Sequence, residues 1–446
     1  MSPADPVERL LALARFERSG MRPGLERIQA LLDGLGHPEA GLRILHVGGT
    51  NGKGSVSALS EAILRAAGLR TGLYTSPHLL SPTERIRIDG APVVRDALAD
   101  DVRALAPRLD SGGITFFEAM TAVALAAFRR AGVEAAVLEV GLGGRWDATT
   151  VGSPLVSALT RIDYDHQEYL GSRLEEIAAE KAAIIRGGIA VSAAQAPEAM
   201  AVVEARCRAL GVPLLVEGRE LRVEARQSDL RGHRLDLAGP GWRMGDVDLG
   251  LPGLFQPANA ILAVGAVRAF AAAAGLTVPD AAIRRGAASV RWPGRFQVIA
   301  GVSAGTPPGR PTIVLDGAHN PGGAAALAAS LVHLFPGART TLVLGISADK
   351  DRAGILKALA PVATRLILTA AAHPRATPPI DLAGELPALD IPVAVEPDPS
   401  LALSRALTDP AAPTAQVVCV AGSLFLVADA LRWLAARGLL PPEALV

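Results

Sequence analysis

Short apolar runs alternate with longer stretches of helical periodicity over residues 44–192. A buried strand needs only a few consecutive apolar residues, whereas a surface helix repeats its apolar residues every three or four positions. Strands that alternate with helices favour a mostly parallel sheet with helices on both faces. The pattern predicts strands at Ile44–Val47, Thr71–Thr75, Ala135–Val140, Val156–Thr160 and Ile189–Ser192.

The pattern changes over residues 213–250. Arg222–Arg226 and Arg234–Leu237 alternate polar and apolar residues, with Gly-Pro-Gly and Gly-Asp close by. Such alternation is typical of strands with one buried face, so we expect a small antiparallel excursion here. A long helix is then predicted from near Pro257 to near Gly275.

A second break falls at Arg291–Arg295, which contains Trp-Pro-Gly, and a Gly/Pro-rich stretch follows at 301–311. The alternation then restarts and predicts a separate doubly wound, Rossmann-like domain. We therefore expect an α/β protein with two domains, 1–292 and 296–446, and a ligand-binding cleft between them. The strands predicted for the second domain are Ile313–Asp316, Thr341–Gly345, Arg365–Thr369, Val393–Val395 and Gln416–Ala421.

Composition narrows the class of protein. A chain of 446 residues has room for two or three domains. The formal net charge is zero, with 44 basic and 44 acidic residues spread along the sequence, so we expect no nucleic-acid partner. The two cysteines, Cys207 and Cys419, lie far apart in apolar surroundings, which fits a reduced, cytosolic setting.

Neither a targeting signal nor a membrane span is expected. Met1–Leu10 contains acids and prolines in place of the basic and apolar pattern of a signal peptide. The alanine-rich stretch Ala258–Leu276 is interrupted by Arg268, which favours a core helix over a membrane span. We expect a cytoplasmic monomer with small-molecule substrates.

The first candidate site is the segment Val47–Ser55, Val-Gly-Gly-Thr-Asn-Gly-Lys-Gly-Ser, between a predicted strand and a predicted helix. Glycines there let backbone N–H groups approach phosphate oxygens, the helix N-terminus adds positive charge, and Lys53 would neutralise the β/γ phosphates. A standard P-loop has glycine in place of Val47 and a hydroxyl in place of Gly54, and here Ser55 comes one residue late. The segment favours a P-loop-type nucleotide site, with an ordinary glycine turn as the alternative.

Lysine is rare in this chain. Only four of the 44 basic residues are lysines: Lys53, Lys181, Lys350 and Lys357. Arginine does not replace lysine as a compact phosphate ligand or a reactive amine, so the surviving lysines are candidates for chemistry. Chance survival explains Lys357, on a predicted exposed helix, better than it explains Lys53 and Lys181.

Glu139 stands at the carboxyl end of a predicted strand, where a glycine-rich segment follows. Burying a carboxylate there is unfavourable unless a cation accompanies it. In a nucleotide site that cation is Mg²⁺, held by one or two carboxylates and phosphate oxygens. The alternative is a salt bridge to Arg145 or Arg161. The phosphate loop upstream favours the metal.

Asp163, Asp165 and His166 follow another predicted strand. Two carboxylates and an imidazole within four residues could assist a second metal ion or a proton transfer, although a structural histidine is equally well supported.

Lys181 lies on the apolar face of a helix predicted over Ser172–Arg186. Desolvation lowers the pKa of a lysine, and the neutral amine becomes chemically usable. This lysine could pair with a carboxylate or react with carbon dioxide to form a carbamate. The alternative is a lysine that snorkels at the rim of the core.

Asp316–Pro321, Asp-Gly-Ala-His-Asn-Pro, follows the first strand of the second domain. Asn320 is a good N-cap and Pro321 the expected first helical residue, so helix capping accounts for both. It does not account for Asp316 and His319, which we expect to project toward the cleft.

Seven motifs in one order resemble the bifunctional dihydrofolate synthase/folylpolyglutamate synthase family of the Mur ligase superfamily. The resemblance runs from Gly24–Arg27 to the last strand, and the late serine of the phosphate loop is usual for this family. The motifs are Gly49–Ser55, Thr75–Leu79 with Glu84–Ile86, Glu139–Arg145, Asp165–His166, Glu180–Lys181, Pro293–Arg295 and Asp316–Pro321.

The resemblance implies an ATP-dependent amide ligase. ATP would phosphorylate a carboxylate of dihydropteroate or of a folate, and the amine of L-glutamate would attack the acyl phosphate, with two Mg²⁺ ions neutralising charge. For ATP it implies Thr50, Asn51, Gly52, Lys53, Gly54, Ser55, Asn259, Arg295 and Asp316. For Mg²⁺ it implies Ser76 with Glu139, and Glu139 with His166. For the pterin substrate it implies Arg22, Pro23, Gly24, Thr115, Phe116, Phe117, Glu118, Trp146, Asp147 and Ala148. For catalysis it implies Lys53, Lys181, which family members carry as a carbamate, and His319.

Two positions depart from the family pattern. Thr150 replaces the usual asparagine, and Phe296-Gln297 stands where an acid often follows Pro-Gly-Arg. These departures concern the balance of the two synthase activities more than the reaction type. A peptidoglycan-precursor Mur ligase normally carries a UDP-sugar-binding domain ahead of the loop, whereas fewer than fifty residues precede Gly49. A P-loop kinase or a switch protein would explain the loop alone.

Overall fold

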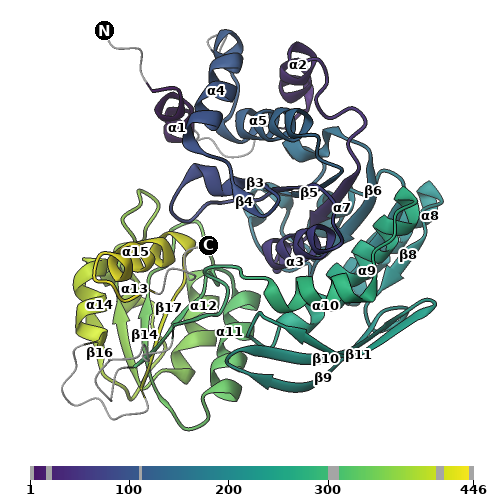
Figure 1. Ribbon diagram of the computed structural model, residues 1–446. Helices are drawn as coiled ribbons and strands as arrows, with labels where there is room; N and C mark the ends of the chain where they lie inside the picture. The colour runs from purple at the N-terminus through teal and green to yellow at the C-terminus, as the bar shows by residue number, and fades with distance from the viewer. Residues whose placement is uncertain (1–4, 17–22, 110–112, 300–310, 408–415, 441–446) are drawn as a thin grey trace.

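The computed structural model describes residues 5–16, 23–109, 113–299, 311–407 and 416–440. Its strands form three sheets. The first two sheets belong to the N-terminal part of the molecule (residues up to 289), and the third belongs to the C-terminal part (residues from 297). Figure 1 shows the third sheet, in green to yellow, beside the first. The small second sheet packs under two helices of the N-terminal part. The expected α/β class, with a mostly parallel first sheet and an antiparallel excursion, is confirmed.

The first sheet has eight strands in the order β4-β3-β2-β5-β1-β6-β7-β8. Six neighbouring strands run parallel, in the order β2, β5, β1, β6, β7 and β8. At one edge, β3 pairs antiparallel with β2, and β4 pairs antiparallel with β3. Burial on both faces explains why the parallel strands are continuous apolar runs. Their bounds are β1 (Ile44–Gly48), β2 (Thr71–Tyr74), β3 (Ile86–Ile88), β4 (Ala91–Pro92), β5 (Ala135–Glu139), β6 (Pro154–Leu159), β7 (Ile189–Ser192) and β8 (Leu214–Val216).

Helices cover both faces of this sheet. One face carries α3 (Lys53–Ala66), α9 (Gln256–Ala274) and α10 (Asp280–Ser289), which share a core with the sheet and with the second sheet. The helices that pack on the other face are α1 (Pro6–Phe16), α2 (Glu26–Gly34), α4 (Arg95–Leu109), α5 (Phe116–Ala131), α7 (Leu174–Ala182) and α8 (Pro197–Leu210). Short helical turns are η1 (Pro82–Arg85), η2 (Ala148–Val151) and α6 (Gln167–Leu170).

Two predicted elements differ from the structure in extent. The helix predicted over Ser172–Arg186 is shorter, because α7 begins at Leu174 and ends at Ala182, where the chain turns. The antiparallel excursion has a third strand, because β9 (Arg222–Asp229) and β10 (Gly232–Gly239) are followed by β11 (Trp242–Leu249). Gly245-Asp246 interrupts the alternation of β11, and Asp246 has a positive φ of 50°.

Helix α9 is the one helix among the described residues that is long and apolar enough to cross a membrane. It lies inside the N-terminal part, against α3 and the strands β6 and β7. Of its most apolar 18-residue stretch, 67% is buried. Its apolar character is therefore used for packing.

The third sheet has six strands in the order β12-β13-β17-β14-β15-β16, parallel except for β12. Its two faces carry separate cores, as expected for a doubly wound domain. The strands are β12 (Gln297–Ile299), β13 (Thr312–Leu315), β14 (Arg339–Leu344), β15 (Arg365–Leu368), β16 (Val393–Val395) and β17 (Gln416–Ala421). One face carries α11 (Pro321–Leu334), α12 (Arg352–Leu359), η3 (Ala360–Val362) and α13 (Pro379–Gly384), and the other α14 (Pro399–Leu407) and α15 (Leu424–Ala435).

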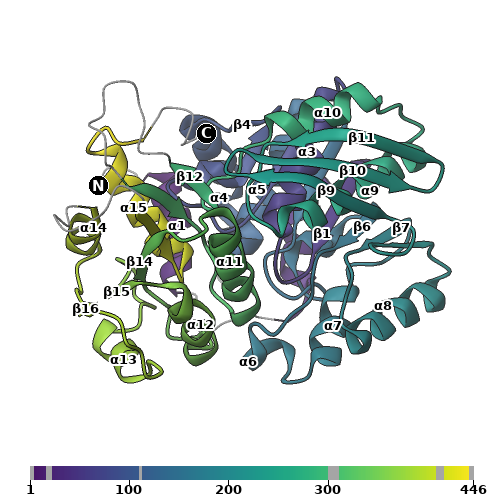
Figure 2. The same cartoon turned by 90° about the horizontal axis from the view of Figure 1, so that it is seen from below.

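The loops that follow β1 and β6 meet the loops that follow β13 and β14. Asn51, after β1, bonds to Asn320, after β13, and His166, after β6, lies against Lys350, after β14. Figure 2 shows α6, which His166 precedes, near α12, which Lys350 precedes. The carboxyl ends of parallel strands in both sheets therefore face one junction, where ligands of α/β proteins bind.

The close packing of α10 on α3 gives a stability prediction. A Cβ on Gly286 would stand 2.6 Å from Cα and 2.7 Å from N of Ile63, so the two helix backbones would have to separate. We expect Gly286→Ala to destabilise the fold by about 1–3 kcal/mol despite the better helix propensity of alanine. Gly384→Ala is the control, because nothing lies near its Cβ position. Urea unfolding that ranks Gly286→Ala at or above wild type would contradict this packing.

Candidate active site

The phosphate loop connects β1 to α3. Gly52 has a φ of 96°, and a Cβ there would clash with the Asn259 amide, so the turn requires glycine. The N–H groups of Thr50 and Asn51 donate to the Arg161 carbonyl, at 2.9 and 3.2 Å. Among the described residues, the N–H groups of the four residues 52–55 have no acceptor. These four N–H groups, at the positive end of the α3 dipole, offer a surface to which an anion can bind.

Three of the four lysines converge on this loop. Lys53 Nζ donates to the carbonyls of Gly49 and Thr50, at 3.3 and 3.1 Å, and buried Lys181 donates to the same Gly49 carbonyl at 3.0 Å. Lys350 reaches the site from the other part of the molecule. Lys357 is exposed on α12. The prediction that Lys181 lies on a buried face is confirmed.

Burial changes the protonation of these amines. Desolvation lowers the pKa of Lys53, against the attraction of Glu139 and Asp165, and the neighbouring cations Arg295 and Lys350 lower it further. Desolvation, and then the charge of Lys53, lower the pKa of Lys181 to about 7. Lys181 is therefore part neutral amine near neutral pH.

Glu139 ends β5 and is 3% exposed. One of its oxygens accepts the Ser76 N–H at 3.1 Å, and the other has no hydrogen-bond donor among the described residues. Burial raises its pKa, while the charges of Lys53 and Arg295 lower it. The alternative of a salt bridge does not hold, because Arg145 pairs with Glu180 and Arg161 is exposed.

The residues after β6 form a tight cluster with the C-terminal part. Asp165 Oδ1 accepts from Lys350 Nζ at 2.7 Å, and Oδ2 accepts from Asn320 Nδ2 at 3.2 Å and lies 3.5 Å from His319 Nε2. Although burial raises its pKa, the hydrogen bond from His319 and the charges around it hold the pKa of Asp165 well below its usual range. Burial lowers the pKa of His166 to about 4, so its Nε2 accepts from Lys350 at 3.1 Å.

These donors suit Mg²⁺ only in part. The described residues contain no cluster of three or more His, Cys, Asp or Glu side chains placed to hold a metal ion. Glu139 nevertheless offers a carboxylate oxygen without a donor among the described residues, beside Ser76 and near the phosphate loop. A Mg²⁺ ion that keeps phosphate oxygens and water as its other ligands fits such a sparse set. The buried Ser55 hydroxyl accepts from the Gln256 amide at 3.2 Å.

The expected nucleotide residues Asn259, Arg295 and Asp316 lie around the loop. Asn259 bonds to Gln256 at 2.9 Å beside Gly52. Arg295 lies in the hinge, the segment Arg291–Arg295 between the two parts of the molecule, and its positive charge opposes the raised pKa of Asp316. Asp316 is buried and accepts the N–H groups of Phe296 and Ala318, at 2.7 and 2.8 Å.

The segments expected to bind the pterin lie side by side, but several of their polar groups hold the fold. Glu118 forms a capping box with Thr115 and pairs with Arg27 at 2.9 Å. Asp147 is buried and accepts N–H groups of its own turn at 2.9 to 3.0 Å. Phe116 and Ala148 are buried, and the Phe117 ring packs over Gly141. Trp146 is 41% exposed, Pro23 is exposed and Gly24 half-buried, while Arg22 lies outside the described residues.

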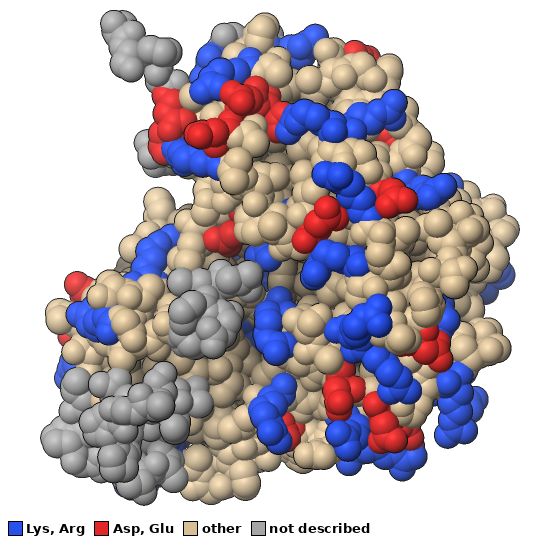
Figure 3. Space-filling model, in the orientation of Figure 1, with Lys and Arg blue, Asp and Glu red and all other residues tan. Residues whose placement is uncertain are grey.

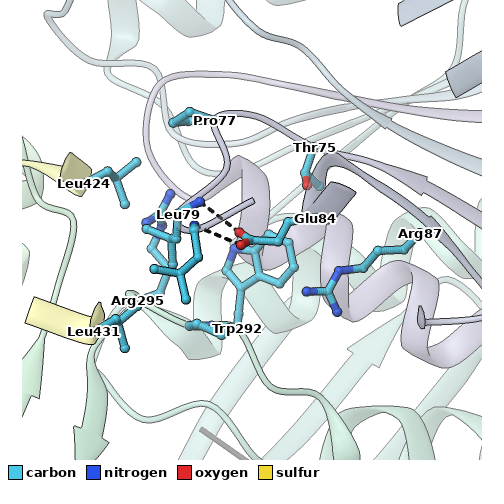
Figure 4. A pocket seen from close by; sticks show the side chains of 11 residues that line it. Thr75, Pro77, Leu79, Glu84, Arg87, Trp292, Arg295, Leu424 and Leu431 are labelled. Atoms are coloured by element: carbon cyan, nitrogen blue, oxygen red, sulfur yellow. Dashed lines mark hydrogen bonds between the residues drawn. The ribbon is translucent and has the colours of Figure 1, made fainter. Parts of the chain in front are cut away.

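A pocket that is open to solvent lies where the loop after β2 meets the hinge and α15. Figure 4 shows Trp292 and Arg295 from the hinge facing Leu79, and the Glu84 carboxylate bonded to the backbone of that loop. Glu84 thus fixes the shape of the loop through three N–H groups, those of residues 79–81, at 2.7 to 2.8 Å. The pocket is lined by Thr75, Pro77, Leu79, Leu80, Glu84, Arg87, Trp292, Pro293, Arg295, Leu424 and Leu431.

Two residues of the site were missed or misread in the sequence. Capping does not account for all of Asn320, because its Oδ1 caps α11 at Gly323 while its Nδ2 donates to Asn51 and Asp165. Lys350 received no role, although the rarity of lysine applied to it as much as to Lys53. That signal could have found it.

The buried amine of Lys181 gives a prediction for the pH dependence of stability. Above about pH 7 the folded lysine loses its proton, whereas the unfolded lysine keeps it up to about pH 10.5. Because the unfolded state then binds more protons, the free energy of unfolding of the wild type should rise with pH across this window relative to Lys181→Met. Denaturant unfolding at several pH values measures the difference, and parallel profiles would contradict the lowered pKa.

The sequence matches two families of domains. The Mur ligase middle domain matches residues 47–267, and the Mur ligase, glutamate ligase domain matches residues 294–424. The chain is 39% identical over 391 residues to the dihydrofolate synthase/folylpolyglutamate synthase of Mycobacterium tuberculosis, covering 83% of this chain and 78% of that protein. It is 31% identical over 420 residues to the Bacillus subtilis protein of the same name, covering 92% and 94%.

Solved structures agree with the sequence relatives. Mycobacterium tuberculosis folylpolyglutamate synthase complexed with ADP superposes with a TM-score of 0.87 at 36% identity, over 96% of this chain and 98% of that one. Escherichia coli FolC in complex with DHPP and ADP gives 0.86 at 31% identity, over 98% and 99%. With this identity over nearly the whole of both chains, the protein belongs to the dihydrofolate synthase/folylpolyglutamate synthase family of the Mur ligases.

Proposed function

We propose that this enzyme adds L-glutamate to dihydropteroate and to the γ-carboxylate of folates, with ATP as the energy source. It is an ATP-dependent ligase of folate synthesis and polyglutamylation. The observation that carries the proposal is the convergence of Lys53, Lys181, Lys350 and Arg295 around four unpaired helix N–H groups. A site with that excess of positive charge suits a triphosphate and a carboxylate that must meet without repelling each other.

The reaction has two steps. A carboxylate oxygen of the substrate attacks the γ-phosphorus of ATP, the bond to the β-γ bridging oxygen breaks, and ADP leaves. The amine of L-glutamate then attacks the acyl carbon and loses a proton, and the tetrahedral intermediate collapses to amide and phosphate. The cations around the loop stabilise the charge on the transferred phosphoryl group and on the acyl phosphate.

The residues take roles by position. The first turn of α3 from Gly52 to Ser55 cradles the phosphates, with Thr50 and Asn51 holding the loop in shape and Lys53 at the β/γ end. Asn259, Arg295 and Asp316 complete the nucleotide site. Ser76 with Glu139, and Glu139 with His166, would hold two Mg²⁺ ions, which supply charge neutralisation on the phosphates.

On the pterin side, Phe117 and Trp146 offer the ring surfaces, and Thr115, Glu118 and Asp147 position them. The segments assigned to the substrate are Arg22–Gly24, Thr115–Glu118 and Trp146–Ala148. His319 would act near the reacting carboxylate. Its Nδ1 lies 2.7 Å from the Gly317 carbonyl and donates to it, and its Nε2 faces the Asp165 carboxylate at 3.5 Å.

The functional unit is a cytoplasmic monomer with two domains, residues 1–292 and 296–446. Buried unpaired cysteines and a packed α9 support a reduced compartment without a membrane partner. Figure 3 shows basic and acidic side chains interspersed on one face, which supports the absence of a nucleic-acid partner.

The test is incubation with ATP, Mg²⁺, L-glutamate and either dihydropteroate or tetrahydrofolate, with products separated by glutamate chain length. ADP, phosphate and a product longer by one glutamate should appear only when all four are present, and EDTA should stop the reaction. ADP release that does not require both a pterin carboxylate and glutamate would point instead to a kinase or a nucleotide switch.

Lys53→Ala should abolish ADP formation with both pteroate and folate substrates, because Lys53, which donates to the carbonyls of both Gly49 and Thr50, is the amine assigned to the β/γ end. Lys357→Ala, which removes an exposed lysine of α12, is the matched control and should keep wild-type rates. Turnover by Lys53→Ala near that of the control would refute the assignment of the phosphate loop.

Lys181 is proposed to carry a carbamate in the active enzyme. Its amine, with a pKa of about 7, is available to add to the carbon of CO₂ and release a proton. The carbamate anion would lie near the cations Lys53 and Lys350. Carbon NMR with ¹³C-bicarbonate should give one carbamate resonance in wild type and in Lys357→Met, and none in Lys181→Met. A wild-type enzyme that is fully active without this resonance would leave Lys181 as a plain buried amine.

A further inference from the structure

Asp165 connects the N-terminal part of the molecule to three side chains of the C-terminal part. It follows β6, yet its partners are Lys350 from the loop after β14 and Asn320 and His319 from the loop after β13. The side chains of Asp165 and Lys350 are 7% and 9% exposed. This is a desolvated ion pair between segments 185 residues apart in sequence.

The same junction continues to the phosphate loop. Asn51 and Asn320 exchange two amide hydrogen bonds, at 3.1 and 2.9 Å, and Asn320 also donates to Asp165. One connected network therefore runs from the phosphate loop through Asn320 and Asp165 to Lys350. Every step crosses between the two parts of the molecule.

We propose that Lys350, through its ion pair with Asp165, is a positioning residue that clamps the C-terminal part onto the phosphate loop during the ligase reaction. The inference rests on the proposed function for its catalytic consequence, but the clamp itself is a property of the ion pair. A buried pair resists separation because the loss of either partner leaves the other charge buried with more distant partners, Asp349 at 3.9 Å from Lys350 and His319 at 3.5 Å from Asp165.

The geometry explains why the reaction needs such a clamp. The phosphate loop with Lys53 belongs to one part, and His319 belongs to the other. Asp165 Oδ2 lies 3.5 Å from His319 Nε2, so the carboxylate that Lys350 holds also sets the place of this imidazole. Displacement of reacting groups by about 1 Å can lower a rate 100-fold.

Lys350 also donates to Nε2 of His166, a residue assigned to a metal ion. A cation at that atom would compete with the Lys350–His166 contact but leave the 2.7 Å pair with Asp165 intact. The clamp therefore depends on Asp165 and not on His166.

The test combines kinetics with a distance measurement. Lys350→Met, Asp165→Asn and the double variant are compared with Lys357→Met, which removes the same charge from an exposed site on α12. Fluorescent labels on Leu210→Cys and Leu401→Cys, both exposed and in different parts of the molecule, report the distance between the parts. The non-hydrolysable analogue AMPPCP serves as the nucleotide.

Lys350→Met and Asp165→Asn should each lower kcat for glutamate addition about 100-fold. The double variant should be no slower than either single one, because both remove the same pair. Lys350→Arg should recover part of the rate. With AMPPCP bound, the label distance should be longer and more broadly distributed in Lys350→Met than in the wild type and in Lys357→Met.

Three outcomes would overturn the clamp. The first is a Lys350→Met rate equal to that of Lys357→Met. The second is additive loss in the double variant. The third is a raised KM for glutamate with an unchanged label distance, which would make Lys350 a ligand of the amino acid. If the wild type forms no glutamylated product, the proposed function fails, while the label distances still decide on the clamp.

Discussion

The structure depends on positive charge held out of water at the junction of its two large sheets. Lys53, Lys181, Lys350 and Arg295 gather around one glycine loop, together with the unpaired N–H groups of α3. Burial opposes the charge of Lys53 and Lys181, as the lowered pKa of each reflects. The nearby carboxylates balance only part of it. A polyanion that enters this space completes the balance, so the arrangement is built for a bound triphosphate.

The fold creates this junction by pointing two parallel sheets at each other. The loop after β1 carries the proposed phosphate site, and the loops after β13 and β14 bring Asn320, His319 and Lys350 against it. Neither sheet holds the full set of side chains. The split suits a ligase, because phosphoryl transfer and amide formation must occur at the same carboxylate, shielded from water. The two matched domain families, a Mur ligase middle domain and a glutamate ligase domain, divide along the same lines.

The local sequence pattern predicts most of the strands, helices and loops, but it does not predict contacts between residues far apart in the chain. Apolar runs located the buried strands, the glycines located the loop, and helical spacing placed Lys181 in the core. The short strands β3, β4 and β12 carry too few residues for a pattern, and Gly245-Asp246 interrupts the alternation that would have predicted β11. The pair of Asp165 with Lys350 joins loops 185 residues apart, so no local pattern encodes it. Asn320 was read as a cap because capping is local, while its second role is tertiary.

The most direct test of the account is a calorimetric comparison of AMP, ADP and AMPPCP binding in the presence of Mg²⁺. If the buried cations and the α3 N-terminus exist to hold a triphosphate, the affinity should rise about tenfold or more with each added phosphate. Equal affinities for the three nucleotides would contradict the central claim, because they would mean that the base and ribose are recognised while the charged loop is not used.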